Sequence, residues 1–137
     1  MGDMNIYFIC SGLEPGKDAV GDYTVELARR VAATGAEVSI VALADRHVAE
    51  RSEEIRSGCR AIRLPKQSAW GVRWQQLLDH VRESRPDWVS LQWVAFGYQD
   101  KGLPWTFGRR FRRAIGDVPL HVMCHEIWVR ADGSGTL

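Results

Sequence analysis

The chain has 137 residues, with 18 Lys and Arg against 17 Asp and Glu, so its formal net charge is +1. Its hydrophobic fraction of 45% and charged fraction of 26% are typical of one globular domain and exclude a disordered chain, a collagen and a coiled coil. The near-neutral charge argues against a dedicated nucleic-acid binder. Three cysteines without a Cys-x-x-Cys pair predict neither a disulfide framework nor a zinc site and favour a cytoplasmic location.

The first third of the chain predicts a strand, a loop, a helix and a second strand. Residues 4–10 form a nearly continuous β-branched and aromatic run, which is typical of a strand buried on both faces of a parallel sheet. Glycines interrupt residues 11–21 and predict a loop. Asp22 is the candidate N-cap of a helix that extends to residue 34, and residues 37–43 follow as a strand. This order predicts one right-handed βαβ unit.

The rest of the chain continues the alternation of strands and helices. Residues 45–56 are expected to be a polar connection, helical in part, and residues 61–64 a short third strand. An apolar stripe from Trp70 to Val81 predicts a helix packed on the sheet. Further strands are expected over residues 87–93 and 118–124.

A last helix is expected between those two strands. Pro104 is its candidate first residue, because proline is favoured there. Its expected buried stripe consists of Phe107, Phe111, Ala114 and Ile115, and its remaining surface carries Arg109, Arg110, Arg112 and Arg113. For these arginines we favour a solvated face over binding to anionic lipid or phosphate. The whole pattern predicts an α/β fold: a single domain with a doubly wound, mostly parallel, Rossmann-like sheet in three layers.

Ligands of such sheets bind at the carboxyl ends of the strands, near the point where strand order reverses. This rule brings residues 11–21, residues 92–98 and the pair His125-Glu126 to one edge. The loop glycines could present N–H groups to a phosphate, although their spacing fits neither a dinucleotide site nor a P-loop, and an ordinary turn is the alternative. His125 could act as a base or a donor, or the pair could simply be an exposed strand end. No ligand spacing points to a metal.

The order of these segments resembles the N-terminal domain of GT-B-type glycosyltransferases, in particular the large retaining family 4, also called the glycosyl transferase group 1 type. The resemblance covers nearly the whole chain. It rests on residues 5–9, 19–23, 26–38, 86–93 and 121–126. Where the family usually has a glycine pair in its first loop, this chain has Asp18-Ala19.

The resemblance implies transfer of a hexose-type sugar from a nucleotide diphosphate sugar to an acceptor, with retention of configuration and without a metal or other cofactor. By the same resemblance, His125 lines the cleft near the transferred sugar as the candidate catalytic residue. Gly16 and Gly21 are the candidate contacts of the donor diphosphate. The acceptor side would be formed by Gln92, Phe96, Tyr98 and Glu126.

We expect residues 1–137 to be the acceptor-side domain alone, with the C-terminal nucleotide-sugar domain absent and no activity by itself. The expected partners are a nucleotide-sugar donor and a sugar or lipid-linked acceptor, bound together with that second domain. A homodimer or a separate second-domain chain is a further partner, and no nucleic acid is expected. The expected location is the cytoplasm, including peripheral association with the inner membrane face. The alternative is a noncatalytic α/β interaction or dimerisation module that uses exposed tryptophans and an uncovered last strand.

Overall fold

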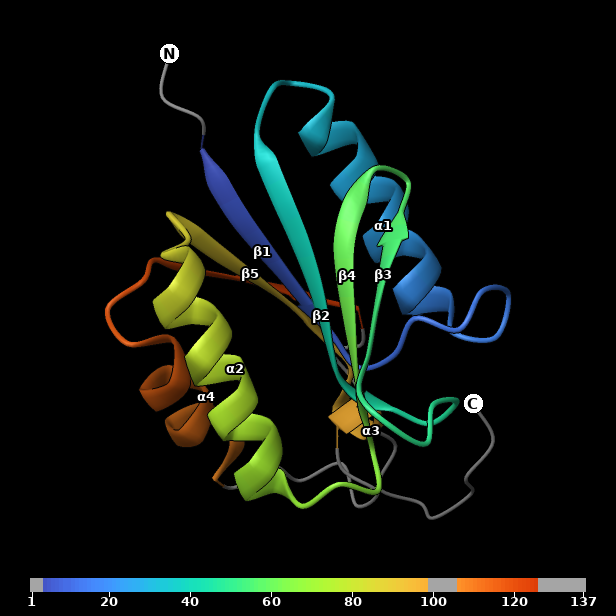
Figure 1. Ribbon diagram of the computed structural model, residues 1–137, viewed down its shortest axis with the longest axis vertical. Helices are drawn as coiled ribbons and strands as arrows, with labels where there is room; N and C mark the ends of the chain where they lie inside the picture. The colour runs from blue at the N-terminus through green and yellow to red at the C-terminus, as the bar shows by residue number, and fades with distance from the viewer. Residues whose placement is uncertain (1–3, 99–105, 126–137) are drawn as a thin grey trace.

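A computed structural model describes residues 4–98 and 106–125, which form six strands and four helices (Figure 1). The strands are β1 (Asn5–Cys10), β2 (Glu37–Asp45), β3 (Ser52–Arg56), β4 (Cys59–Pro65), β5 (Trp88–Trp93) and β6 (Leu120–Cys124). The helices are α1 (Ala19–Ala32), α2 (Trp70–Ser84), α3 (Ala95–Tyr98) and α4 (Phe107–Ile115). The predicted α/β class is therefore confirmed, with a mostly parallel sheet.

The six strands form one sheet in the order β3-β4-β2-β1-β5-β6. β3 is antiparallel to β4, and every other neighbouring pair is parallel. Without the antiparallel edge strand, the parallel strands stand in the order third, second, first, fourth, fifth along the chain. The direction of winding therefore reverses between β1 and β5, which is where open α/β sheets bind ligands.

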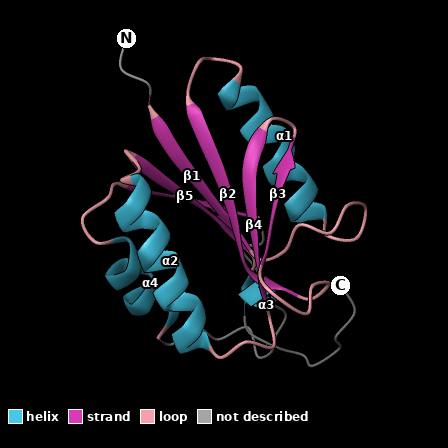
Figure 2. Ribbon diagram, viewed as in Figure 1, coloured by secondary structure: helices cyan, strands magenta, loops and turns pink. Residues whose placement is uncertain are grey.

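Two apolar clusters lie on opposite faces of the sheet, and helices cover both (Figure 2). Tyr7 and Ile9 point to the face that α2 and α4 cover, whereas Phe8 and Cys10 point to the face that α1 covers. β1 is thus apolar on both faces, which explains its unbroken run of apolar residues. The aromatic core of the first face includes Trp70 stacked on Trp74 at 5.0 Å between ring centroids.

Helix α1 begins earlier than predicted. Its N-cap is Asp18, whose carboxylate accepts a hydrogen bond from the Gly21 N–H at 2.9 Å. The prediction of Asp22 as the cap is wrong, because Asp22 lies inside the first turn. Aspartate suits both positions, since its charge is favourable throughout the first turn of a helix.

The expected partly helical connection over residues 45–56 is also wrong in part, because its last five residues form β3. β3 pairs with β4 across a turn at Ser57 and Gly58, both of which have positive φ. The strand is charged because it lies at the sheet edge, where side chains alternate between exposed and half-buried positions. Glu53, for example, forms an ion pair with Arg60 of β4. This polarity conceals the strand from a search for apolar runs.

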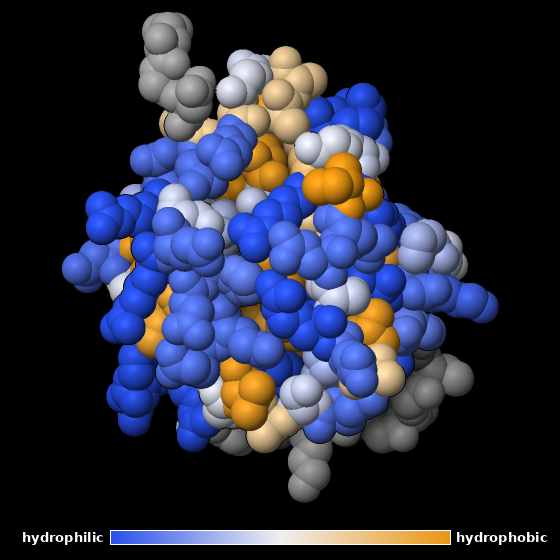
Figure 3. Space-filling model, in the orientation of Figure 1, coloured by the Kyte–Doolittle hydropathy of each residue, from blue (hydrophilic) through white to orange (hydrophobic). Residues whose placement is uncertain are grey.

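Helix α4 has the predicted amphipathic character. Its buried residues are Phe107, Phe111, Ala114 and Ile115, and the four arginines of the segment are exposed. Pro104, the predicted first residue, lies outside the described residues. On the face drawn in Figure 3, hydrophobic residues are scattered among hydrophilic ones and form no continuous patch. Among residues 4–98 and 106–125, no helix has the length and hydropathy needed to cross a membrane.

Candidate functional site

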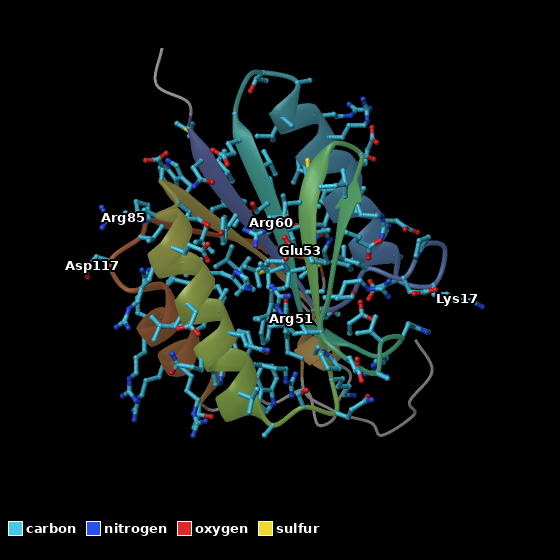
Figure 4. All side chains as sticks on the ribbon, viewed as in Figure 1. Lys17, Arg51, Glu53, Arg60, Arg85 and Asp117 are labelled. Carbon is cyan, nitrogen blue, oxygen red and sulfur yellow. The ribbon has the colours of Figure 1, made fainter. Side chains whose placement is uncertain are left out.

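A cavity of about 300 Å³ lies at the carboxyl end of the sheet, beside the reversal of strand order. Its walls are the β1–α1 loop, the segment after β2 and the turn from β5 to α3. They include Ser11, Asp18, His47 and Gly97. Lys17 also lines the cavity, and Figure 4 shows its side chain at the outer end of the β1–α1 loop, pointing away from the sheet. The predicted edge therefore does carry a concave surface.

Close backbone approaches build this end of the molecule. A Cβ atom on Gly21 would lie 2.3 Å from the carbonyl oxygen of Gly12, so only glycine lets the first turn of α1 pack against the loop. A Cβ atom on Gly97 would lie 2.9 Å from the Ser11 hydroxyl oxygen. Gly21, which the resemblance assigned to the donor diphosphate, thus has a packing role in this structure.

Carboxylates already occupy both N–H groups predicted to contact the diphosphate. The Gly21 N–H donates to Asp18, and the Gly16 N–H donates to Asp22 at 3.1 Å. A phosphate bound to these groups would have to displace two negative charges. The structure therefore places Gly16 and Gly21 in one loop, but with acidic partners where an anion would bind.

Three charged side chains tie the β1–α1 loop to the sheet; we call Asp45, Arg63 and Glu14 the ionic cluster. Arg63 donates to Asp45 through Nε at 2.8 Å and through a terminal nitrogen at 3.1 Å. The same terminal nitrogen lies 2.6 Å from a Glu14 oxygen. The Asp45 side chain is 0% exposed and that of Arg63 is 10% exposed. Because both ions are buried, removing Arg63 would leave the Asp45 carboxylate without a counter-ion, and removing Asp45 would leave Arg63 only the more exposed carboxylates of Glu14 and Glu54.

Backbone groups complete the ionic cluster. Asp45 also accepts from the N–H of Leu13 at 3.0 Å and from the N–H of His47 at 2.9 Å. Burial alone would raise the pKa of Asp45, but the hydrogen bonds from Arg63, His47 and Leu13 together lower it below its ordinary value. Asp45 is therefore ionised at neutral pH and fixes the path of the chain on both sides of the cavity.

A second polar group lies on β5 and β6, on the other side of the switch point. We call His121, Ser90, Gln92 and His125 the histidine row. His121 Nδ1 lies 2.9 Å from the Ser90 hydroxyl oxygen, which accepts from Gln92 Nε2 at 3.0 Å. Gln92 Oε1 lies 2.9 Å from His125 Nε2. The strand register explains the row, because Ser90 pairs with His121 and Gln92 follows two residues later on the same face.

His125 ends the row at the carboxyl edge. Its backbone N–H donates to the Trp93 carbonyl at 3.0 Å, which extends the β5–β6 ladder by one residue. Its ring packs edge-to-face with the ring of Tyr23 of α1, with 5.0 Å between ring centroids. Burial lowers the pKa of His125 below its ordinary value. The ring is therefore neutral at neutral pH, with one nitrogen available to accept a hydrogen bond.

Two of the four predicted acceptor-side residues are buried supports. Gln92 is 0% exposed and hydrogen-bonds His125, whereas Tyr98 is 1% exposed and donates from its hydroxyl to the Gln92 carbonyl at 2.6 Å. Phe96 lies in α3, but its side chain is outside the described part of the structure. Glu126 lies outside the described residues.

The sequence reading did not identify the ionic cluster, nor Ser90 and His121. The sequence does contain a pattern that points to the ionic cluster and another that points to the polar face of β5. Asp45 and Arg63 are charges within or directly after apolar strand segments, and such charges are seldom buried unless they are paired. In β5, Ser90 and Gln92 alternate with Val89 and Leu91, which indicates one polar face.

Within the part of the chain that the structure describes, no three His, Cys, Asp or Glu side chains are grouped so that they could hold a metal ion. A scan against models of known protein families finds no match to the chain, and a search of curated proteins finds none either.

Proposed function

We propose that this chain is the acceptor-side domain of a retaining glycosyltransferase that uses a nucleotide diphosphate sugar. In this proposal the sheet is the three-layered, doubly wound, Rossmann-like sheet of such a domain. His125 contacts a sugar hydroxyl near the site of transfer. The donor nucleotide is held mainly by a second domain, so the chain alone binds sugars but does not transfer them.

One observation carries the proposal: a neutral, half-buried histidine at the end of β6, hydrogen-bonded to a buried glutamine at the carboxyl edge of the sheet. A neutral imidazole both donates and accepts hydrogen bonds, as a sugar hydroxyl does. The ring of Tyr23, which is 43% exposed and contacts His125, adds an aromatic surface of the kind on which a sugar ring can pack. Such a combination suits a neutral polyhydroxyl ligand better than an anion.

In this proposal the donor diphosphate meets the β1–α1 loop. Gly16 and Gly21 remain its proposed contacts, and their N–H groups would become available only if the Asp22 and Asp18 carboxylates turned away. Lys17 and Arg46, which line the cavity, carry the opposite charge. We further propose a cytoplasmic location, including peripheral association with the inner membrane face.

Calorimetric titration of the full chain tests this function. Free mono- and disaccharides should bind weakly, with a Kd of about 1 mM or above, because an open half-site buries little of the ligand. His125→Ala should abolish binding, and His47→Ala should leave it unchanged. Failure of every saccharide to bind would refute the proposal. Turnover of a nucleotide sugar by the chain alone, lost in His125→Ala, would refute its claim that a second domain is required.

A further inference from the structure

The hydrogen bonds of the histidine row run in one direction, and we propose that Gln92 and Ser90 are positioning residues that set the tautomer of His125. They hold its imidazole with the proton on Nε2, so that Nδ1 is the nitrogen that accepts a hydrogen bond from a sugar hydroxyl. The nature of that hydroxyl rests on the proposed function. The tautomer itself rests only on the geometry of the row.

The first step concerns the Gln92 amide. Its carbonyl oxygen Oε1 can only accept, so the His125 Nε2 that lies 2.9 Å away must carry the proton. Its nitrogen Nε2 donates to the Ser90 hydroxyl oxygen at 3.0 Å. Gln92 is 0% exposed, so its amide cannot satisfy these groups with bulk water instead.

The second step concerns the Ser90 hydroxyl. Its oxygen accepts from Gln92, and its single proton needs an acceptor because Ser90 is only 6% exposed. His121 Nδ1, at 2.9 Å, is that acceptor. His121 therefore also carries its proton on Nε2 when neutral, and the buried Ser90 hydroxyl has both a donor and an acceptor within the row.

A reversed row would have a different signature. If the Gln92 amide were turned over, its NH₂ group would donate to His125 Nε2 and its oxygen would accept from Ser90. His121 Nδ1 would then have to donate to the Ser90 oxygen. Both histidines would be protonated on Nδ1, so the two rings report the direction of the row independently of each other.

Residue 92 must be an amide, because it has to accept a hydrogen bond from His125 and donate one to Ser90. Glutamate offers no donor to Ser90, and leucine of similar size offers neither donor nor acceptor. Likewise, the Ser90 hydroxyl can be replaced by threonine but not by alanine. These pairs supply matched variants for a test.

The test is a long-range ¹H–¹⁵N correlation spectrum of the full chain labelled with ¹⁵N-histidine, at about pH 8, where a histidine of ordinary pKa is neutral. His121→Ala and His125→Ala assign the signals. We expect pyridine-type Nδ1 and pyrrole-type Nε2 in both rings, with a tautomer ratio of about 10 or more, the factor contributed by one hydrogen bond. Protonated Nδ1 in both rings, or an even mixture, would overturn the proposal.

Substitutions of Ser90 and Gln92 show whether these side chains set the histidine tautomers or only fill space. In Ser90→Ala both tautomer ratios should fall toward 1, whereas Ser90→Thr should restore them and His47 should not change in either variant. In Gln92→Leu only the ratio of His125 should fall. An unchanged His125 ratio in Ser90→Ala would refute the role of Ser90 even if Gln92→Leu failed to fold. Predicted tautomers without saccharide binding would refute the proposed function alone, and reversed tautomers with saccharide binding would refute this inference alone.

Discussion

The ionic cluster and the histidine row lie at the same edge of one sheet, on either side of the switch between β1 and β5, yet they are built in opposite ways. The ionic cluster brings full charges together, and its central carboxylate accepts four hydrogen bonds. The histidine row contains no carboxylate or guanidinium and links imidazole, hydroxyl and amide groups over two strands. The carboxyl edge of the sheet therefore carries full charges on the β2–β4 side, whereas on the β5–β6 side it carries polar side chains without carboxylate or guanidinium groups.

This difference indicates which half can exchange partners with a ligand. A buried ion pair is costly to open, because each charge left behind loses its compensation. A neutral hydrogen bond contributes only about 0.5–1.5 kcal/mol, which a sugar hydroxyl can replace. We therefore assign the ionic cluster to holding the loop and the histidine row to meeting the ligand.

Breaking the ionic cluster should have the largest effect on stability. Asp45→Ala leaves the buried Arg63 without its main partner and two N–H groups without an acceptor, so we expect a loss of about 3–5 kcal/mol in the free energy of unfolding. Glu14→Gln, at the more exposed end of the cluster, should cost no more than about 1 kcal/mol. Urea denaturation measures both variants. Similar losses in the two would contradict a cluster centred on Asp45.

The glycine contact between loop and helix should come next. Gly21→Ala forces a Cβ atom against the Gly12 carbonyl, and we expect a loss of about 1–3 kcal/mol. Gly108→Ala in α4 is the matched control, because no atom lies within 4 Å of its new Cβ, and it should gain up to about 1 kcal/mol. Thermal and urea unfolding can compare them. Equal changes in unfolding free energy would mean that the close approach of Gly21 to Gly12 does not constrain the β1–α1 loop.

Placing a carboxylate in the histidine row should make it resemble the ionic cluster. Gln92→Glu puts a carboxylate beside His125 Nε2, and we expect the pKa of His125 to rise by about 1 to 3 pH units. An NMR titration of the His125 ring measures this pKa, with His47 as an internal reference. A pKa that does not rise would show that the two side chains are not in contact.

The contributions of His125 and Asp45 to folding stability should be lost in separate pH ranges. The folded-state pKa of His125 is lowered, so the unfolded chain binds the extra proton and stability falls as pH drops from about 6.5 through the folded value. The pKa of Asp45 is also lowered, so its contribution is complete above about 3.9 and is lost as pH falls below that. Unfolding free energies of wild type, His125→Asn and Asp45→Asn from pH 8 to 2 should show a smaller decline in the histidine range for the first variant and a smaller decline in the carboxyl range for the second. His80, Glu26 and Glu53, whose pKa values are also lowered, keep their own contributions in both variants. Loss of both declines in one variant would contradict two independent groups.

The smallest effect concerns the glycine loop. Asp22→Asn removes the charge that occupies the Gly16 N–H, and we expect the affinity of the chain for inorganic pyrophosphate to rise a few-fold, about 1 kcal/mol or less. Calorimetry at low salt measures this change. An unchanged affinity would remove the loop from the proposed donor site.

Periodicity predicted the central strands and the existence of helices α1, α2 and α4, because their apolar residues recur where the core needs them. It failed for β3, whose edge position removes the apolar signal, and for the cap of α1, because two aspartates compete within one turn. His125 and Gln92 were found by their place at strand ends. The ionic cluster was missed because its members come from residues 14, 45 and 63, and their meeting depends on the β1–β2–β4 register.

The central claim is that the histidine row, and not the ionic cluster, meets a sugar. Amide ¹H–¹⁵N spectra of the full chain during titration with saccharides test it most directly. The account predicts shifts that centre on residues 90–94 and 121–125, increase to saturation and disappear in His125→Ala. Shifts centred on residues 13–18 and 45–47, or shifts that persist in His125→Ala, would contradict it.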